Sequence, residues 1–589
     1  MKQKNSDFHS IIKVAETMKD SKNQLVTVWD HWQYNAQTAP NHDAIIHWVA
    51  GEEPFRWTYK SILEMADRFS AHLTAVGIKK GDVCAIIIKH NPYFYPLYMA
   101  VAGIGATPAV LAYPNPRLHP DKFRQGIEGM SQRSGLDYIL TQRDIEQIIS
   151  PLVTKEGSTI KSMYFPLEWD LVSPPDEKII SSLQEVRAGI RREDPFLLQH
   201  SSGTTGLQKP VLLSHRAVLE HVECYFESIQ LTSDDKVVSW LPLYHDMGLI
   251  AAFHLPLAYG IPTIQIDPFE WVLAPVMLIE AATKEKGTLT WLPNFAFNFM
   301  ADRIDDEEME GLTLSTFRLI VNCSEPVRDA SHIRFRERFG AYGLQEHAFS
   351  ASYGMAETTF AVTQTPPDKP LVTITVDRDA LANGKVIEYS GKEKPTRICV
   401  SCGKPIRGCN VKIVDENRNP LPDGVVGELA VTSLSIFDGY RNYPEKTAEV
   451  YDGEWYFTGD YGFIYQDEYY IIGRKKDIII VAGKNIYPED IEDAVNKVAG
   501  VLPGRVIAFG EEISDLGTEQ VSVVAETDLT GEDDRAQLRR AIVDTGMGID
   551  VTIAAIYLVP PRWLIKSSAG KPSRKGNKDR LDEMKTYAV

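Results

Sequence analysis

Cysteine is scarce in this chain of 589 residues, which contains only six. Three of them, Cys399, Cys402 and Cys409, form a C-x2-C-x6-C run that resembles the spacing of a metal site. No fourth Cys or His follows at a useful spacing, and Cys399 and Cys402 lie in the strand-like run ICVSCG. We therefore expect reduced, structural cysteines here.

The chain also lacks an uninterrupted apolar run long enough to cross a membrane. Its longest apolar region, residues 237–262, is interrupted by His245, Asp246 and His254. Residues 1–24 contain no apolar core of the length that a signal peptide needs. We therefore expect no stable membrane insertion and a cytoplasmic location.

The chain has fewer basic than acidic residues: 62 Lys and Arg against 80 Asp and Glu, which gives a net charge of −18. This balance argues against a general nucleic-acid-binding protein, since contacts to many phosphates require a basic face. It leaves room for a single nucleotide bound in a locally basic cleft.

The order of apolar runs predicts a mostly parallel, layered α/β architecture in the first part of the chain. Strand-like and helix-like runs alternate here, and the same pattern continues to about residue 360. The expected strands are 83–90, 107–113, 136–141, 194–199, 236–242, 261–267, 287–293 and 317–326, and the expected helices are 92–106, 216–229, 245–260, 270–286 and 294–304.

The chain is too long for one compact core, so we expect two to four domains. Prolines and short β-rich pieces over residues 366–473 predict a β subdomain attached to a large N-terminal domain, residues 1–473. Strand and helix runs then predict a compact α+β domain over 474–589. It ends in a basic segment, KSSAGKPSRKGNKDR (566–580).

Residues 199–211, QHSSGTTGLQKPV, predict a flexible hydroxyl-rich loop between a strand and a helix. Glycines let a backbone approach phosphate closely, while hydroxyls, amides and one lysine can donate to its oxygens. The Walker spacing GxxxxGK[ST] is absent. Taken alone, the loop is also compatible with an ordinary Ser/Thr/Gly surface loop, although the phosphate-binding interpretation is favoured. Other polar segments follow predicted strands, where open α/β sheets bind ligands.

Seven motifs follow one another along the chain: SSGTTGLQKPV, LPLYHDMGL, NCSEPV, SYGMAETT, YFTGDYGF, GRKKDIIIVAGKNIYPEDIE and SSAGKPSRKGNK. In this order they resemble the motifs of the adenylate-forming (AMP-binding) superfamily, and the resemblance covers roughly residues 30–585. That superfamily includes acyl-CoA synthetases, fatty acyl-AMP ligases, peptide-synthetase adenylation domains and luciferases.

The resemblance implies ATP and Mg²⁺ as cofactors and assigns three catalytic residues. Lys571 would place a compact cation between the substrate carboxylate and the α-phosphate, where both reactants are anionic. Glu357 would hold Mg²⁺ together with Thr204. His245 would line the carboxylate end of the acyl pocket.

The same resemblance implies a nucleotide site built from several segments. Tyr353 would stack on the adenine, Asp460 and Arg474 would contact the ribose, and Thr204, Thr205 and Lys209 would hold the β- and γ-phosphates. The whole expected set is Ser201, Ser202, Gly203, Thr204, Thr205, Gly206, Lys209, Ser324, Glu325, Pro326, Ser352, Tyr353, Gly354, Met355, Ala356, Thr358, Asp460 and Arg474.

Five of these residues also have a purely structural interpretation. Lys571 could be one of several lysines in a solvated tail, and Glu357 a glutamate favoured by a helix dipole. Asp460 and Tyr353 are compatible with ordinary turn residues, and His245 with a buried structural histidine.

In relatives a thiol next attacks the acyl carbon and releases AMP, after the C-terminal domain rotates about a hinge. Lys476 occupies the matching position in GRKKD. Rotation would withdraw Lys571 before the second step.

Two details resemble the fatty acyl-AMP ligase branch: the long insert at 375–406, and KNIYPEDIE (484–492), in which Ile486 replaces the usual histidine. They predict activation of a medium- or long-chain fatty acid to an acyl-adenylate with pyrophosphate release. The acyl group would then pass to the phosphopantetheine thiol of an acyl carrier protein.

The acceptor stays open, because Pro210-Val211 replaces the usual PKG and GKPSRK replaces GKIRR. An acyl-CoA synthetase is therefore the alternative. An amino-acid-activating enzyme would need an acid beside the substrate amine, for which Asp246 is the candidate. The apolar residues 249–262 and the aromatic run 294–300 favour a hydrocarbon tail instead, or form plain core. A non-enzymatic relative would be expected to lack Lys571 or Glu357.

Overall fold

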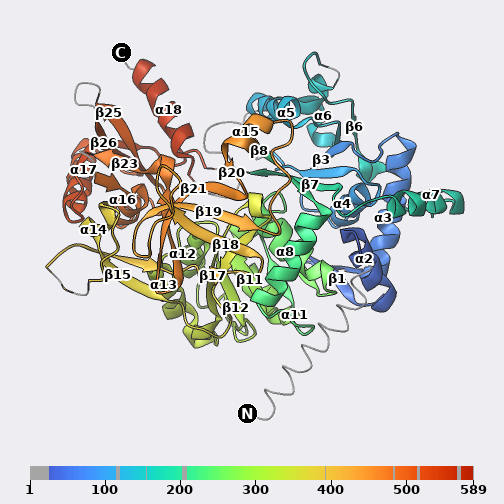
Figure 1. Cartoon of the computed structure of the whole chain (residues 1–589), viewed down its shortest axis with the longest axis horizontal. Coiled ribbons are helices and arrows are strands. Elements are labelled where there is room, and N and C mark those ends of the chain that lie inside the picture. Colours follow the sequence, from blue (N-terminus) through green and yellow to red (C-terminus); the bar gives the residue numbers. More distant parts are fainter. Residues whose placement is uncertain are drawn as a thin grey trace, which may run out of the picture.

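The computed structural model shows a layered α/β body with smaller β and α+β parts (Figure 1). Along the chain the elements run from the blue N-terminal helices and strands to the red C-terminal ones, at opposite ends of the view. The structure describes residues 25–114, 120–153, 155–201, 208–389, 391, 393–481, 484–513, 518–566 and 572–587.

A nine-stranded sheet forms the centre, in the order β17-β14-β13-β12-β11-β9-β10-β1-β2. The pairings that join β13, β12, β11, β9, β10 and β1 are all parallel, which confirms the α/β expectation. Antiparallel strands are added at both ends of this order: β14 and β17 at one, β2 at the other. The strands are β1 (Asp43–Trp48), β2 (Phe55–Thr58), β9 (Val237–Ser239), β10 (Thr263–Ile266), β11 (Leu289–Leu292), β12 (Leu319–Asn322), β13 (Phe349–Gly354), β14 (Ala361–Gln364) and β17 (Lys404–Pro405).

A second, four-stranded sheet is wholly parallel, in the order β4-β3-β5-β6. Three of its strands confirm the predictions at 83–90, 107–113 and 136–141. Its strands are β3 (Val83–Ile87), β4 (Thr107–Val110), β5 (Tyr138–Thr141) and β6 (Ser162–Tyr164), and its nearby helices include α3 (Tyr59–Ala75), α4 (Phe94–Gly103) and α5 (Pro120–Ser134).

The hydroxyl-rich loop does not lead directly into a helix, so that prediction was wrong. Strand β7 (Pro195–Ser201) pairs antiparallel with β8 (Lys209–Ser214) before α8 (His215–Ser228) begins. The run 209–214 is mostly buried, with Val211 and Leu213 fully so, and it forms a strand of its own. The hydroxyl of Ser214 then caps α8 by accepting from the Ala217 backbone N–H.

The single helix predicted for residues 270–286 is also wrong, because the structure contains two. Helix α10 (Pro268–Leu273) stops before Pro275, and α11 (Met277–Glu285) follows it. Proline lacks an N–H and disfavours a helical conformation in the residue before it. Ala274, at that position, has φ −136° and ψ 80°.

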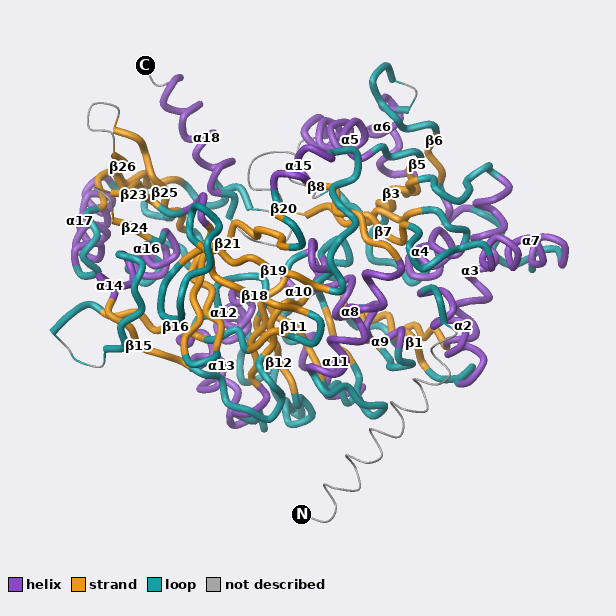
Figure 2. Tube along the Cα trace, viewed as in Figure 1, coloured by secondary structure: helices purple, strands orange, loops and turns teal. Residues whose placement is uncertain are grey.

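A five-stranded antiparallel sheet follows in the chain, with β22 added beside β21 in the order β18-β19-β21-β20. Figure 2 shows it between the C-terminal strands and β7 in this view. The strands are β18 (Cys409–Val414), β19 (Gly427–Ser433), β20 (Tyr451–Asp452), β21 (Trp455–Tyr465) and β22 (Glu468–Arg474), with β15 (Thr373–Asp377) and β16 (Thr396–Val400) forming a separate pair.

The β subdomain expected to begin near residue 366 contributes a strand to the central sheet. Strand β17, at residues 404–405, pairs with β14 and so extends the central sheet. Residues 366–473 are therefore joined to the α/β body through the sheet itself.

The C-terminal elements have a hydrophobic core of their own, which includes Ile479, Ile491, Val523, Leu538 and Ile542. This grouping has the mixed α+β character predicted after residue 474. The elements are β23 (Ile479–Val481), β24 (Lys484–Ile486), β25 (Val506–Ile513), β26 (Thr518–Glu526), β27 (Ile553–Val559), α16 (Pro488–Val495), α17 (Glu532–Met547) and α18 (Arg574–Tyr587).

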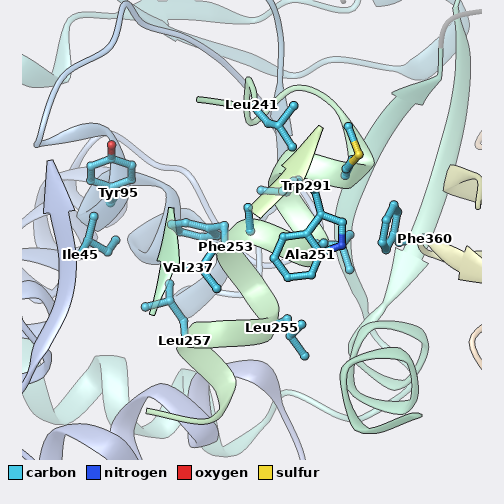
Figure 3. Packing of buried hydrophobic residues seen from close by; sticks show 14 of the residues in the cluster. Ile45, Tyr95, Val237, Leu241, Ala251, Phe253, Leu255, Leu257, Trp291 and Phe360 are labelled. Atoms are coloured by element: carbon cyan, nitrogen blue, oxygen red, sulfur yellow. The ribbon is translucent and has the colours of Figure 1, made fainter. Parts of the chain in front are cut away.

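The apolar run beginning at Met247 lies inside the main core. Residues Met247–His254 form a π-helix, continued by α9 (Leu255–Ala258), and all of them are buried. Figure 3 shows Ala251, Phe253, Leu255 and Leu257 packed among core residues that include Trp291 and Phe360. The plain-core interpretation therefore holds for residues 247–258. Among the described residues, the structure has no helix with the length and apolar character that a membrane span requires.

Candidate active site

The predicted site segments meet where neighbouring parallel strands end. Strands β12 and β13 pair through Asn322 and Ala351, which brings Ser324, Glu325 and Pro326 beside the Ser352–Gly354 end of β13. This is the edge at which open α/β sheets bind ligands. Two further groups of side chains, from β8, β21 and β22, lie against this edge.

Glu357, Lys209 and Tyr440 form the first group. The Tyr440 hydroxyl donates to Glu357 Oε1 at 2.7 Å and accepts from Lys209 Nζ at 3.2 Å. Lys209 Nζ lies 3.9 Å from the same carboxylate oxygen. Burial lowers the pKa of Lys209, while the Glu357 charge opposes that shift. Burial, followed by the Glu357 charge, raises the pKa of the Tyr440 hydroxyl, which therefore remains a proton donor.

Asp460, Tyr353 and Arg474 form the second group. The Tyr353 hydroxyl donates to Asp460 Oδ2 at 2.6 Å, and Arg474 Nε lies 3.5 Å from Oδ1. Asp460 and Arg474 face each other because β21 and β22 pair in that register. Burial, followed by the Asp460 charge, raises the pKa of Tyr353. One carboxylate oxygen is thus held by a neutral donor and the other faces a cation.

The turn that carries Glu357 requires close backbone packing. A Cβ built on Gly354 would lie 2.3 Å from the Phe360 carbonyl oxygen, so only glycine fits there. The Met355 N–H donates to that same carbonyl, at 2.8 Å. Ala356 and Thr358 are buried in the turn, and the Thr358 hydroxyl donates to the Met355 carbonyl at 3.1 Å.

Two other predicted residues are held by contacts within the fold. The buried Ser352 hydroxyl donates to the Thr363 carbonyl at 2.8 Å. Glu325 Oε2 accepts from the Phe295 backbone N–H, at 2.8 Å. That N–H lies in the first turn of α12 (Asn294–Arg303), where a carboxylate is favoured by the helix dipole.

His245 lies two residues before the π-helix that begins at Met247. Its ring centroid is 5.0 Å from that of Tyr244, whose carbonyl accepts from Gln199 Nε2 on β7 at 2.6 Å. Ser324 Oγ lies 3.6 Å from Met247 Sδ, which links this segment to the end of β12.

Aromatic side chains cover the neighbouring strand ends. Trp240 stacks on Trp271 with ring centroids 3.6 Å apart, and Phe295 and Phe299 lie against this pair. Phe295 and Phe299 are only partly buried, unlike the residues of the π-helix. They are therefore better placed than residues 249–258 to contact an apolar ligand.

Lys476 and Lys566 bring further positive charge toward the site. Desolvation lowers the pKa of Lys476 to about 8, and repulsion from Arg474 and Lys209 adds to the shift. Desolvation also lowers the pKa of Lys566 to about 8, with Arg505 adding to the shift and Glu325 opposing it.

Several predicted residues fall outside the part of the chain that the structure describes. These are the phosphate-loop residues Ser202, Gly203, Thr204, Thr205 and Gly206, and the catalytic candidate Lys571. Ser201 is the last residue of β7 and pairs with Lys209, so both ends of the predicted phosphate loop are described.

The profile of a family described as "AMP-binding enzyme" matches residues 32–441. The chain belongs to the AMP-binding enzyme family.

This AMP-binding enzyme is similar to two relatives over most of its length. It is 30% identical to "Probable long-chain-fatty-acid--AMP ligase FadD30" of Mycobacterium tuberculosis, over 92% of this chain and 95% of that protein. It is 31% identical to "Medium-chain-fatty-acid--[acyl-carrier-protein] ligase JamA" of Moorena producens, over 71% of this chain and 72% of that protein.

A solved structure is similar to this AMP-binding enzyme over nearly its whole length. That structure is of fatty acyl-adenylate ligase from L. pneumophila in complex with acyl adenylate and pyrophosphate. The two chains are 26% identical with a TM-score of 0.70, over 94% of this chain and 96% of the other.

Sequence reasoning missed Tyr440, although its hydroxyl contacts two predicted site residues. No local pattern separates it from the other tyrosines among the 25 of the chain. Its partner Glu357 lies 83 positions away in the chain, so only the tertiary structure reveals the contact. Gln199 was quoted within the loop motif but given no role. All six cysteines lie among the described residues, where they are buried and form no disulfide, and no group of His, Cys, Asp and Glu in that part of the chain could hold a metal by itself.

Proposed function

We propose that this enzyme activates a medium- or long-chain fatty acid with ATP, forming an acyl-adenylate and releasing pyrophosphate. It then transfers the acyl group to the phosphopantetheine thiol of an acyl carrier protein. The observation that carries this proposal is the meeting of two charged groups at one sheet edge: Glu357 with Lys209, and Asp460 with Arg474. The names of the relatives support the choice of a fatty acid.

In this proposal the phosphates are held by the loop 201–206 together with Lys209. The Glu357 carboxylate and the Thr204 hydroxyl supply oxygen ligands of the kind that Mg²⁺ prefers. Mg²⁺, when bound, neutralises phosphate charge. The presence of a buried carboxylate beside Lys209, with one oxygen held by Tyr440, fits such an ion.

The nucleoside is held by the strand ends. Asp460 accepts from the ribose hydroxyls with Arg474 beside it, and Tyr353 contacts the adenine from β13. The remaining segments supply the backbone around the base and the adenylate: Ser324, Glu325, Pro326, Ser352, Gly354, Met355, Ala356 and Thr358.

Lys571 aligns the reacting groups by placing its ammonium between the substrate carboxylate and the α-phosphate. The ammonium reduces the repulsion between the two anionic reactants, and this repulsion is the main barrier to the step. His245 lines the carboxylate end of the acyl pocket, and Phe295 and Phe299 contact the hydrocarbon chain.

For the second step, the C-terminal domain (474–589) rotates about Lys476 relative to the N-terminal domain (1–473). Lys571 then leaves the site and the thiol can approach the acyl carbon. JamA, whose name specifies an acyl carrier protein, supports that acceptor over CoA.

The test is pyrophosphate release over a series of fatty acids from short to long chains, with a panel of amino acids as the matched control. We expect release with medium or long chains only. Products are then analysed by mass spectrometry with either CoA or a holo acyl carrier protein as the acceptor. Release with amino acids alone would refute the fatty-acid assignment, and thioester formed only with CoA would establish the acyl-CoA synthetase alternative.

A further inference from the structure

One segment of the chain binds both the strand that carries Lys209 and the turn that carries Glu357. We call residues 435–441 the linking segment. It follows β19, the strand that ends at Ser433, and precedes α15 (Pro444–Glu449). None of its residues was assigned a role in the reaction above.

On one side, the linking segment runs along β8 as an added strand. The Leu212 N–H donates to the Gly439 carbonyl at 3.1 Å, and the Asp438 and Arg441 N–H groups donate to β8 carbonyls, each at 2.9 Å. Val211 and Tyr440 form the bridge between these bonds. Gly439 has φ 108°, a conformation that favours glycine. Tyr440 thus lies opposite Val211, which is two residues after Lys209 on β8.

On the other side, the linking segment holds the Glu357 turn. The Phe437 N–H donates to the Glu357 carbonyl at 2.8 Å. The Ser435 hydroxyl donates to the Thr358 carbonyl at 3.1 Å, and the Thr359 hydroxyl donates to the Ser435 carbonyl at 2.7 Å. The backbone of the segment therefore sets the position of Glu357 relative to β8.

The Tyr440 side chain lies between the two charges that the segment brings together. Tyr440 is 3% exposed and Glu357 is 6% exposed, so solvent contributes little to orienting the carboxylate. The hydroxyl donates to Glu357 Oε1 and accepts from Lys209, which uses its donor and one acceptor position. A hydrogen bond to a buried charge is among the stronger ones, and it orients the second carboxylate oxygen as well.

We propose that Tyr440 is a positioning residue that orients Glu357 for the divalent cation of the ATP complex and holds Lys209 beside it. The proposal rests on the proposed function, in which Glu357 is the metal ligand. Tyr440 does not touch the reacting atoms; it acts through Glu357 and Lys209.

The test measures metal binding directly, with Mn²⁺ as the probe. Tyr440→Phe removes the hydroxyl and keeps the ring. We expect the dissociation constant of Mn²⁺ from the ATP complex, measured by electron paramagnetic resonance, to rise about tenfold, which corresponds to about 1.4 kcal/mol. The Mg²⁺ concentration that gives half-maximal pyrophosphate release should rise in parallel.

Tyr456→Phe is the matched control. Tyr456 is also buried, and its hydroxyl lies 3.5 Å from that of Tyr440, but no hydrogen bond to Glu357 or Lys209 is found for it among the described residues. We expect its Mn²⁺ affinity to stay within about twofold of the wild type. If both variants lose stability equally and bind Mn²⁺ with equal affinity, Tyr440 is only structural and the proposal fails.

A double-mutant cycle keeps the proposal testable if Tyr440→Phe is destabilised. In a Glu357→Gln background, Tyr440→Phe should change Mn²⁺ affinity far less than it does in the wild type. An equal change in both backgrounds would overturn the proposal. Mn²⁺ binding needs no fatty acid, so this result is separate from the proposed function, which fails if the wild type releases no pyrophosphate with any fatty acid.

Discussion

The Tyr353 hydroxyl donates a 2.6 Å hydrogen bond to Asp460 Oδ2, and these two residues come from different sheets. The tyrosine was expected only to stack on the adenine. The contact gives it a second task, because it fixes the carboxylate that is proposed to accept from the ribose.

Tyr353→Phe should therefore weaken recognition of the ribose more than it slows the reaction. Loss of a charge-assisted hydrogen bond predicts a rise of about tenfold in the KM for ATP, with kcat nearly unchanged. The measurement is pyrophosphate release with ATP and with 2′-deoxy-ATP. The variant should discriminate less between the two nucleotides than the wild type does, and unaltered discrimination would contradict the role given to this contact.

Arg397→Ala should loosen the C-terminal part of the chain. Arg397 lies on β16 and its guanidinium is 3.1 Å from Asp490 on α16, with both side chains largely buried. Arg328 also approaches Asp490, at 3.5 Å. Breaking a buried pair costs about 3 kcal/mol, and the remaining contact of Asp490 with Arg328 offsets part of that cost. Hydrogen exchange of the α16 amides should accelerate by roughly 10-fold.

Arg407→Ala is the control for that experiment. Arg407 pairs with Glu223 at 2.9 Å, but the Arg407 side chain is 44% exposed and the Glu223 side chain 43% exposed. Surface pairs of this kind contribute about 0 to 1 kcal/mol. If α16 exchanges at the same rate in both variants, the Arg397–Asp490 pair does not hold the C-terminal part in place.

Binding of ATP should depend on pH through Lys476. Its pKa is lowered to about 8, so the ammonium loses its charge as the pH rises through that value. A polyphosphate favours the charged form, which raises the pKa and draws in protons on binding. We expect ATP affinity to fall between pH 7 and pH 9, with proton uptake near pH 8 detected by calorimetry in buffers of different ionisation enthalpy.

Two neighbouring lysines make a matched comparison. Lys476→Met should reduce the proton uptake. Lys475→Met should leave it unchanged, because desolvation of Lys475 is outweighed by its contact with Glu428, 3.2 Å away, and its pKa is raised. Equal uptake in both variants would show that Lys476 does not face the nucleotide.

Lys571→Ala should abolish adenylate formation while ATP still binds. Removing a charge that acts at the transition state predicts a loss of at least about 100-fold in the rate of pyrophosphate release. ATP affinity, measured by calorimetry, should change by less than about threefold. Lys575→Ala is the control, because Lys575 is exposed and pairs with Asp579 within α18. Undiminished pyrophosphate release from Lys571→Ala would refute the assignment.

Local patterns determined much of the architecture. The strand at 83–90, the helix at 92–106 and the helix at 216–229 were predicted because each has a continuous or periodic apolar face of the right length. The order of motifs such as SYGMAETT and YFTGDYGF was enough to predict the AMP-binding superfamily, and the family match confirms it. Two details were predicted wrongly. The strand β8 between the loop and its helix was missed, and the helix predicted over 270–286 is divided before Pro275.

The contacts that organise the site were decided by the tertiary structure. Tyr440 reaches Glu357 and Lys209, and Arg397 reaches Asp490, across separations of 83, 231 and 93 positions in the chain. A hydroxyl or guanidinium becomes important at such places because its surroundings are buried and its partner is charged. Burial and partner both depend on how distant segments pack, so a tyrosine or arginine in the sequence carries no sign of either. The sequence by itself therefore determined the family and predicted which segments form the candidate site, and packing decided which side chains hold those segments in position.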